Sequence, residues 1–332
     1  MVTATGVLGR SRLVAASLCL ALALLGCAPT TTSTSAGPSD GRLGSRRAEL
    51  SPACASPGQM VTIADPGLAK SVMRSLTQPD VDATTLPCSA MAELSTVTAR
   101  GVSSLEGLQY AVNLSSVTLE DSSVASLAPL SGLLRLQSLD SLGGSLTTLD
   151  SLADTPALTV LTVRDNALAG AVDLGRFPRL VQVDLSGNSI TDVSGVDELP
   201  ELWWLDMSDN QITDTAALSG AANLRVLKLN RNAIEVADVL SNLRQLDWIE
   251  MESNLLSNVD FVEHLDLRIL KLSGNRITSV AGLARNRFLG AEQPYDLRHN
   301  CIDLASSDPF VQDLLSRGDS LLLDPQAECA AG

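Results

Sequence analysis

His299, Cys301 and Asp303 are residue types that can form a nucleophile and a base, and they lie close together in the sequence. No GxSxG, phosphate-binding loop or HExxH motif accompanies them, and no GxGxxG turn follows a predicted strand. A turn that carries a structural disulfide explains the grouping better than a catalytic pair does. The sequence therefore predicts that this protein is not an enzyme.

Metal and cofactor sites are also not expected. The chain has only two histidines, His264 and His299, and no CxxC pair that could hold zinc or act as a redox centre. Several carboxylates fall in predicted turns, without the dense Asp/Asn loop of an EF-hand. Calcium binding by these turns stays open as an alternative, and the carboxylates concerned are Asp192, Asp197, Asp214 and Asp238.

The residues best suited to recognition are tryptophans, and a repeat positions them. Leu180-x-x-Val183-x-Leu185-x-x-Asn188-x-Ile190 is followed by the same pattern from Leu202 and from Leu224, at a spacing of 22 residues. This pattern and period are typical of leucine-rich repeats. The predicted fold is an α/β solenoid, right-handed, with a parallel sheet on its concave face. Each segment that returns from one strand to the next, here called an arc, is predicted to form a short 3₁₀ turn on the convex face.

Alternation along each strand places the third, fifth, seventh and eighth repeat positions on the concave face. The third position of successive repeats forms the tryptophan column, which consists of Trp204, Val226, Trp248 and Ile269. Exposed apolar surface marks contact sites, and tryptophan is enriched among binding hot spots. The alternative is that the indoles pack flat and only stiffen the sheet. The residues predicted to bind a partner are Trp203, Trp204, Asp206, Val226, Lys228, Trp248, Glu250 and Glu252.

A second set of repeated side chains is predicted to be structural. Asparagine at the ninth position can satisfy backbone groups of its own and adjacent turns. Ser122 and Gly144 replace it in the two earliest repeats, so a less regular ladder is expected there, and Ser141 stands where other repeats place an apolar residue. The ninth-position asparagines are Asn166, Asn188, Asn210, Asn232, Asn254, Asn275 and Asn300.

Both ends of the repeat region, 92–300, are predicted to carry caps, at 52–91 and 301–332. In the C-terminal cap a helix starts at Asp308-Pro309 and buries Phe310, Leu314 and Leu315. Strands stack about 4.8 Å apart, so the two ends of nine or so coils are separated by roughly 40 Å. A disulfide needs Cα atoms within about 7 Å. The pairs Cys54–Cys88 and Cys301–Cys329 are therefore expected, one in each cap.

Residues 1–26 have the features of a targeting segment. Arg10 and Arg12 precede an apolar run, Leu13 to Leu25, that is too short to favour a membrane span. It ends in Leu24-Leu25-Gly26-Cys27, which resembles a bacterial lipobox. The alternative is an ordinary signal peptide with a chance cysteine. The resemblance implies that Cys27 is lipidated and that the protein lies on the outer face of the cytoplasmic membrane. Residues 27–51 are polar and small and are predicted to form a disordered tether.

The region from about Val61 onward, including Gly101-Val102-Ser103-Ser104-Leu105, resembles the internalin-type leucine-rich repeat family. The resemblance implies a protein that binds another protein through its concave face, and a monomer is expected. The partner is a host or an envelope component. The formal charge of −15 argues against nucleic acid. The alternative function is an envelope scaffold that binds wall polymer weakly.

Overall fold

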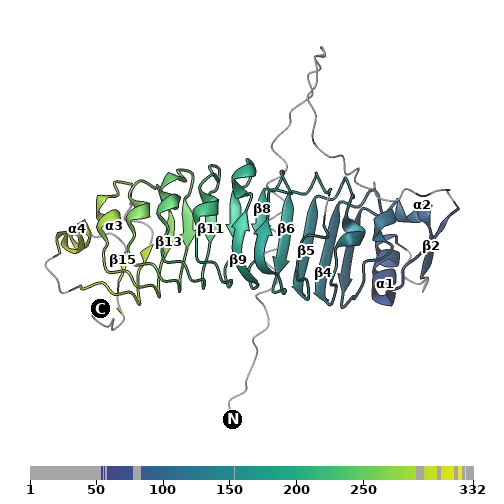
Figure 1. Cartoon of the computed structure of the whole chain (residues 1–332), viewed down its shortest axis with the longest axis horizontal. Coiled ribbons are helices and arrows are strands. Elements are labelled where there is room, and N and C mark those ends of the chain that lie inside the picture. The colour runs from purple at the N-terminus through teal and green to yellow at the C-terminus, as the bar shows by residue number, and fades with distance from the viewer. Residues whose placement is uncertain are drawn as a thin grey trace, which may run out of the picture. The chain divides into compact units, whose positions relative to one another are not determined.

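The 22-residue spacing brings one short strand from each repeat into a single sheet (Figure 1). This computed structural model describes residues 54, 56, 58–77, 84–152, 154–288, 295–304, 308–317, 321–323 and 326. The chain divides into two units, Met1–Arg46 and Arg47–Gly332, and every described residue belongs to the second. The predicted targeting segment, the tether, Cys27 and Cys329 lie outside the described residues.

The main sheet has eleven strands in the order β15-β14-β13-β12-β11-β10-β8-β6-β5-β4-β3, and the registered pairs are parallel. Sequential repeats therefore lie side by side, as a solenoid requires. The strands are β3 (Thr96–Arg100), β4 (Ser116–Ser122), β5 (Ser138–Gly144), β6 (Val160–Arg164), β8 (Gln182–Asp184), β10 (Trp204–Asp206), β11 (Val226–Lys228), β12 (Trp248–Glu250), β13 (Ile269–Lys271), β14 (Tyr295–Asp296) and β15 (Leu321–Leu322).

The apolar positions of the repeat form one continuous core. Leu180, Val183, Leu185 and Ile190 are fully buried, and the equivalent residues of the neighbouring repeats are buried in the same way. Because each repeat buries its apolar side chains against the next one, no repeat has a core of its own. The leucine-rich repeat prediction is confirmed.

The ninth-position asparagines form the expected ladder. Asn254 donates from Nδ2 to the carbonyls of Leu229 and Met251, at 2.8 and 3.2 Å, and its Oδ1 accepts from the backbone N–H of Ile234 at 3.1 Å. Asn188, Asn210, Asn232, Asn275 and Asn300 make equivalent bonds. Each carboxamide thus ties its own turn of the backbone to the preceding one.

The ladder begins at Asn166, and glycine is needed beside it. A Cβ atom at Gly144 would lie 2.5 Å from Asn166 Oδ1, which is too close for any other residue without movement. Before this point the strands run further: β4 and β5 have seven residues each, and pairing continues to Ser122 and Gly144. Extended pairing replaces the asparagine turn in these two repeats, which explains their irregular sequence.

Six of the described arcs contain the expected 3₁₀ turns. The 3₁₀ turns are η1 (Leu108–Tyr110), η2 (Ala128–Leu130), η3 (Val196–Glu198), η4 (Ala216–Leu218), η5 (Asp238–Asn242) and η6 (Asp260–Val262). Two arcs also contain an extended stretch: strands β7 (Ala169–Asp173) and β9 (Ser189–Ser194) form a separate parallel pair, and β9 is followed by η3 in the same arc. Val172 and Val193 are buried there, and Gly170 has a φ of +74° next to a register shift. β-Branched residues and a glycine bulge favour this extended path.

The N-terminal cap closes the first repeat. Strands β1 (Met60–Thr62) and β2 (Thr85–Pro87) are antiparallel, and helices α1 (Pro66–Ser75) and α2 (Cys88–Met91) accompany them. Asp65 caps α1 through the N–H of Leu68 and also accepts from the N–H of Ser103 at 2.7 Å. Burial raises the pKa of Asp65, but the hydrogen bonds from Ser103 and Leu68 outweigh it and leave the pKa below its ordinary value.

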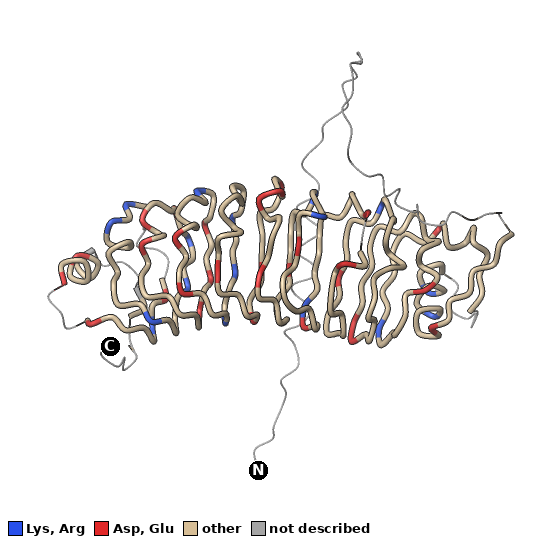
Figure 2. Tube along the Cα trace, in the orientation of Figure 1, with Lys and Arg blue, Asp and Glu red and all other residues tan. Residues whose placement is uncertain are grey.

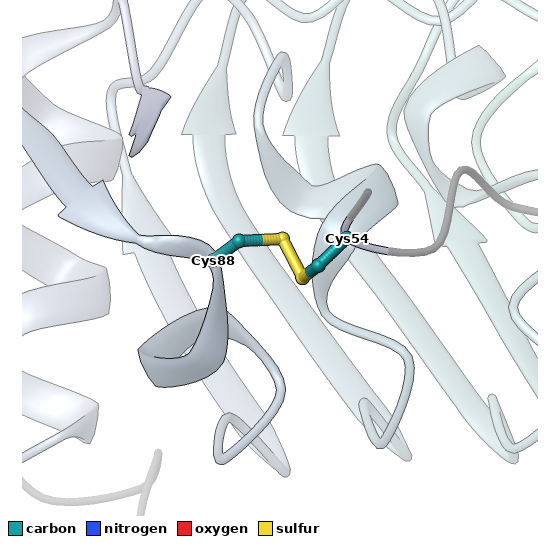
Figure 3. Close-up of a disulfide and its surroundings, with 2 residues drawn as sticks. All are labelled: Cys54 and Cys88. Carbon is teal, nitrogen blue, oxygen red and sulfur yellow. A yellow bond between two sulfur atoms is a disulfide. The ribbon is translucent and has the colours of Figure 1, made fainter. Parts of the chain in front are cut away.

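A disulfide joins Cys54 to Cys88 in this cap, with their Cα atoms 5.8 Å apart (Figure 3). This is the pair expected from the sequence. At the other end Cys301 is also disulfide-bonded. Its expected partner, Cys329, is not among the described residues.

Helices α3 (Ala281–Arg285) and α4 (Pro309–Arg317) lie at the C-terminal end. Val311 and Leu314 are buried, but Leu315 is exposed, which corrects the expectation that it packs on the last coil. Successive helical residues are rotated by about 100°, so Leu315 lies to one side of the buried stripe. In the part of the chain that the structure describes, no helix is long and apolar enough to cross a membrane.

Candidate recognition surface

Strand register aligns the tryptophan column. Trp204 pairs with Val226, Val226 with Trp248, and Trp248 with Ile269, on β10 to β13. Trp204, Trp248 and Ile269 are half-buried. Val226 is only 8% exposed, which corrects its predicted place as an open apolar contact. The register puts this small side chain between two indoles, so large neighbours reduce its access to solvent.

Glu250 is buried at the centre of the surface. Its Oε1 accepts from Trp248 Nε1 at 2.9 Å and from Lys271 Nζ at 2.8 Å. Its Oε2 accepts from Asn230 Nδ2 at 3.1 Å and lies 3.9 Å from Lys228 Nζ. A buried carboxylate with this many partners is bonded on both oxygens. Glu250 therefore belongs to the framework of the surface and is not a free acid at its rim.

The charges in this cluster stabilise one another. Burial raises the pKa of Glu250, but the hydrogen bonds from Lys271 and Trp248 and the nearby charge of Lys228 outweigh it, so the pKa is below its ordinary value. The hydrogen bond to Glu250 raises the pKa of Lys271. Lys228 Nζ also lies 5.3 Å from the centre of the Trp248 ring, within cation–π range. Trp248 is thus held through both its ring face and its N–H group.

The other acids of the sheet face also have internal partners. Glu252 accepts from Ser273 Oγ at 2.9 Å, and Asp206 accepts from the backbone N–H of Ser208 at 2.9 Å. Asp184 is nearly buried, and burial raises its pKa despite hydrogen bonds from Ser186. The acids lie beside the tryptophan column, where the repeat predicts them. Glu250 and Asp184, however, have little exposed charge to offer a basic partner.

Trp203 is the most exposed of the three tryptophans, at 37%. It lines a groove of about 700 Å³ at the edge of the sheet where the strands begin. Val226 also lines this groove, whereas Trp204, Trp248 and the other predicted contact residues do not. The remaining lining residues are Pro200, Glu201, Asn223, Arg225, Gln245, Asp247 and Arg268.

Sequence reasoning missed the arginines of this groove. Arg225 and Arg268 occupy the second position of their repeats, equivalent to Trp203. That position precedes the strand and was not counted as part of the concave face. The signal was available in the repeat, because any residue directly after the first leucine must lie at this edge.

Replacing Glu250 by glutamine is expected to lower the free energy of unfolding by about 1–2 kcal/mol at neutral pH. The cost arises because Lys228 and Lys271 lose their shared negative partner. Since the folded pKa of Glu250 is lowered, its contribution is fully present above about pH 4.3, the pKa of an unfolded glutamate. The contribution is lost as the pH falls through the folded value. Urea unfolding from pH 7 to pH 3 should show the two proteins converging.

Glu235→Gln is the matched control, because Glu235 is exposed on an arc. A Glu250→Gln protein as stable as this control at pH 7 would mean that the cluster contributes nothing.

Cys301 lies two residues after His299 in the sequence. Cys301 is disulfide-bonded and therefore has no thiolate that could act as a nucleophile. Over the described residues, His, Cys, Asp and Glu side chains form no group of three that could hold a metal ion.

Comparisons with known proteins support the assignment of leucine-rich repeats. A family model described as Leucine Rich repeat matches residues 205–219. No match is found among curated proteins. The structure is similar to internalin C2 from Listeria monocytogenes, with 25% identity and a TM-score of 0.54 over 71% of this chain and 97% of that one. It is similar to the functional domain of InlJ from Listeria monocytogenes, with 20% identity and a TM-score of 0.61 over 83% of this chain and 63% of that one.

A plant structure shares the fold as well. It is the peptide hormone receptor RGFR1 in complex with RGF2, with 19% identity and a TM-score of 0.51 over 73% of this chain and 45% of that one. Repeat pattern, asparagine ladder, parallel sheet and structural likeness agree, and the protein is a leucine-rich repeat solenoid with an internalin-like fold.

Proposed function

We propose that this chain is a non-enzymatic recognition protein, anchored by lipid outside a bacterial cytoplasmic membrane, that binds a protein partner through its sheet face. The observation that carries the proposal is the fixed tryptophan column on β10 to β13. Trp248 is held by Glu250 and Lys228, so its indole is already oriented before a partner arrives. Preorganised aromatic side chains bind with little loss of conformational entropy.

Structural likeness supports a protein as the partner. Leucine-rich repeat proteins of this fold include the plant receptor solved with its peptide hormone. The alternative, a scaffold with weak affinity for wall polymer, requires no rigid aromatic column. The half-buried Trp204 and Trp248 therefore favour a protein.

The anchor is a separate part of the proposal and rests on Leu24-Leu25-Gly26-Cys27. Cys27→Ser is expected to abolish incorporation of labelled fatty acid, and the protein should be released or remain unprocessed. Cys19→Ser is the control, because Cys19 lies within the apolar run and should leave lipidation unchanged. Normal labelling and membrane fractionation of the Cys27→Ser protein would remove lipid anchoring from the account.

Recognition can be tested by chemical crosslinking on living cells, followed by purification of the full chain. A protein adduct is expected from the natural chain, and the Trp204→Ala/Trp248→Ala double variant should yield much less of it. Recovery of wall glycan fragments without a protein adduct would support the scaffold function instead.

A further inference from the structure

We propose that the groove beside Trp203 is a second recognition site, which seats an extended segment of a partner protein carrying an acidic side chain next to an apolar one. The inference rests on the proposed function, since it assumes a protein partner. It adds a distinct site at the sheet edge, outside the tryptophan column.

The groove combines an apolar wall with an unpaired positive charge. Trp203 is exposed just before β10, and Arg225 is exposed just before β11. The backbone N–H of Arg225 donates to the Trp203 carbonyl at 2.9 Å, so the two residues are immediate neighbours. Within the described residues the Arg225 guanidinium has no ion pair and no hydrogen bond, although acidic residues predominate in the chain.

The neighbouring charges explain why Arg225 is the one that selects a ligand. Asp247 forms an ion pair with Arg268, so these two side chains largely cancel. Glu201 is exposed at the Trp203 end of the groove. A ligand that matches the groove would therefore place a carboxylate on Arg225, an apolar side chain on Trp203 and a basic or polar residue near Glu201. Figure 2 shows acidic and basic positions interspersed along the stack of repeats.

The length of the groove also fits an extended segment. Its lining residues belong to four successive repeats, from Trp203 to Arg268. Three strand spacings of about 4.8 Å give roughly 14 Å. An extended chain advances about 3.3 Å per residue, so about four residues span the groove. Arginine holds a carboxylate through two parallel hydrogen bonds, which sets the position of the acidic residue along this length.

The test is to pan a phage-displayed library of random seven-residue peptides against the full chain. Enriched peptides should carry Asp or Glu beside a large apolar residue. The best peptide should lose at least about tenfold in affinity with Arg225→Gln, and Arg225→Lys should recover only part of it because the forked contact is missing. Arg135→Gln is the control, because Arg135 is exposed at the same sheet edge in a distant repeat.

Peptide binding by variants distinguishes the groove from the tryptophan column. The Trp204→Ala/Trp248→Ala variant should bind the peptide normally, because neither residue lines the groove. The groove proposal is overturned if enriched peptides lack acidic residues, if Arg225→Gln binds them like the control, or if soluble wall glycan fragments bind there instead. Such a result would leave the proposed function standing if the cell-surface protein adduct is still recovered.

Discussion

Replacing Asn254 by alanine is expected to lower the free energy of unfolding by about 4 kcal/mol. Asn254 is 3% exposed and joins Ile234, Leu229 and Met251 through three hydrogen bonds. Each lost bond costs about 1 kcal/mol, and the buried backbone groups left without a partner add more. The loss should begin locally, because each repeat contacts only its neighbours.

Asn223→Ala is the control for this variant. Asn223 is exposed and donates one bond, to the Pro200 carbonyl at 2.6 Å, so its removal should cost about 1 kcal/mol or less. Urea unfolding followed by circular dichroism gives the comparison, and hydrogen exchange shows where opening starts. Equal stability of the two variants would show that the asparagine ladder is not what holds the turns together.

The second large effect is expected in binding. Trp204→Ala and Trp248→Ala should each lower the binding free energy for the partner by about 2 kcal/mol, which is roughly a thirtyfold loss of affinity. Truncation of aromatic anchors typically has an effect of this size. The change should fall mainly on the dissociation rate. Trp248→Phe should cost less, since it keeps a six-membered aromatic ring and loses the fused five-membered ring whose N–H group donates to Glu250.

Val236→Ala is the matched truncation away from the site, because Val236 is exposed on an arc, at 59%. Melting temperatures must be compared, since truncating Trp248 also removes a bond from the buried Glu250. Unchanged affinity in a folded Trp204→Ala/Trp248→Ala protein would place the site elsewhere, at the sheet edge or on the arcs.

The fold could be predicted from the sequence because every repeat gives independent evidence for the same pattern. The same spacing that aligned Leu180, Leu202 and Leu224 also aligned their asparagines, and register then determined which side chains share a face. The pair β7 and β9 was not predicted. Whether an arc contains an extended stretch depends on a few side chains, here Val172, Val193 and Gly170, which the repeat does not constrain.

The alignment of the tryptophans followed from the repeat, but the surroundings of their side chains did not. Register placed Trp204 and Trp248 on one column, as expected. Burial of Glu250 and Val226 could not be read from the sequence, because it depends on how large neighbours on adjacent strands fill the space between them. The partners of Glu250 come from its own strand, from β13, and from β11 and the turn after it, and their rotamers decide which charges remain exposed.

Site-specific photo-crosslinking on living cells tests the central claim, recognition through the sheet face, most directly. A photoreactive amino acid at Gln182 would stand beside Trp204, its registered neighbour, without removing a tryptophan. The same amino acid at Val236 would report on an arc. A protein adduct is expected from position 182 and none from position 236. An adduct from position 236 alone, or from neither position, would contradict it.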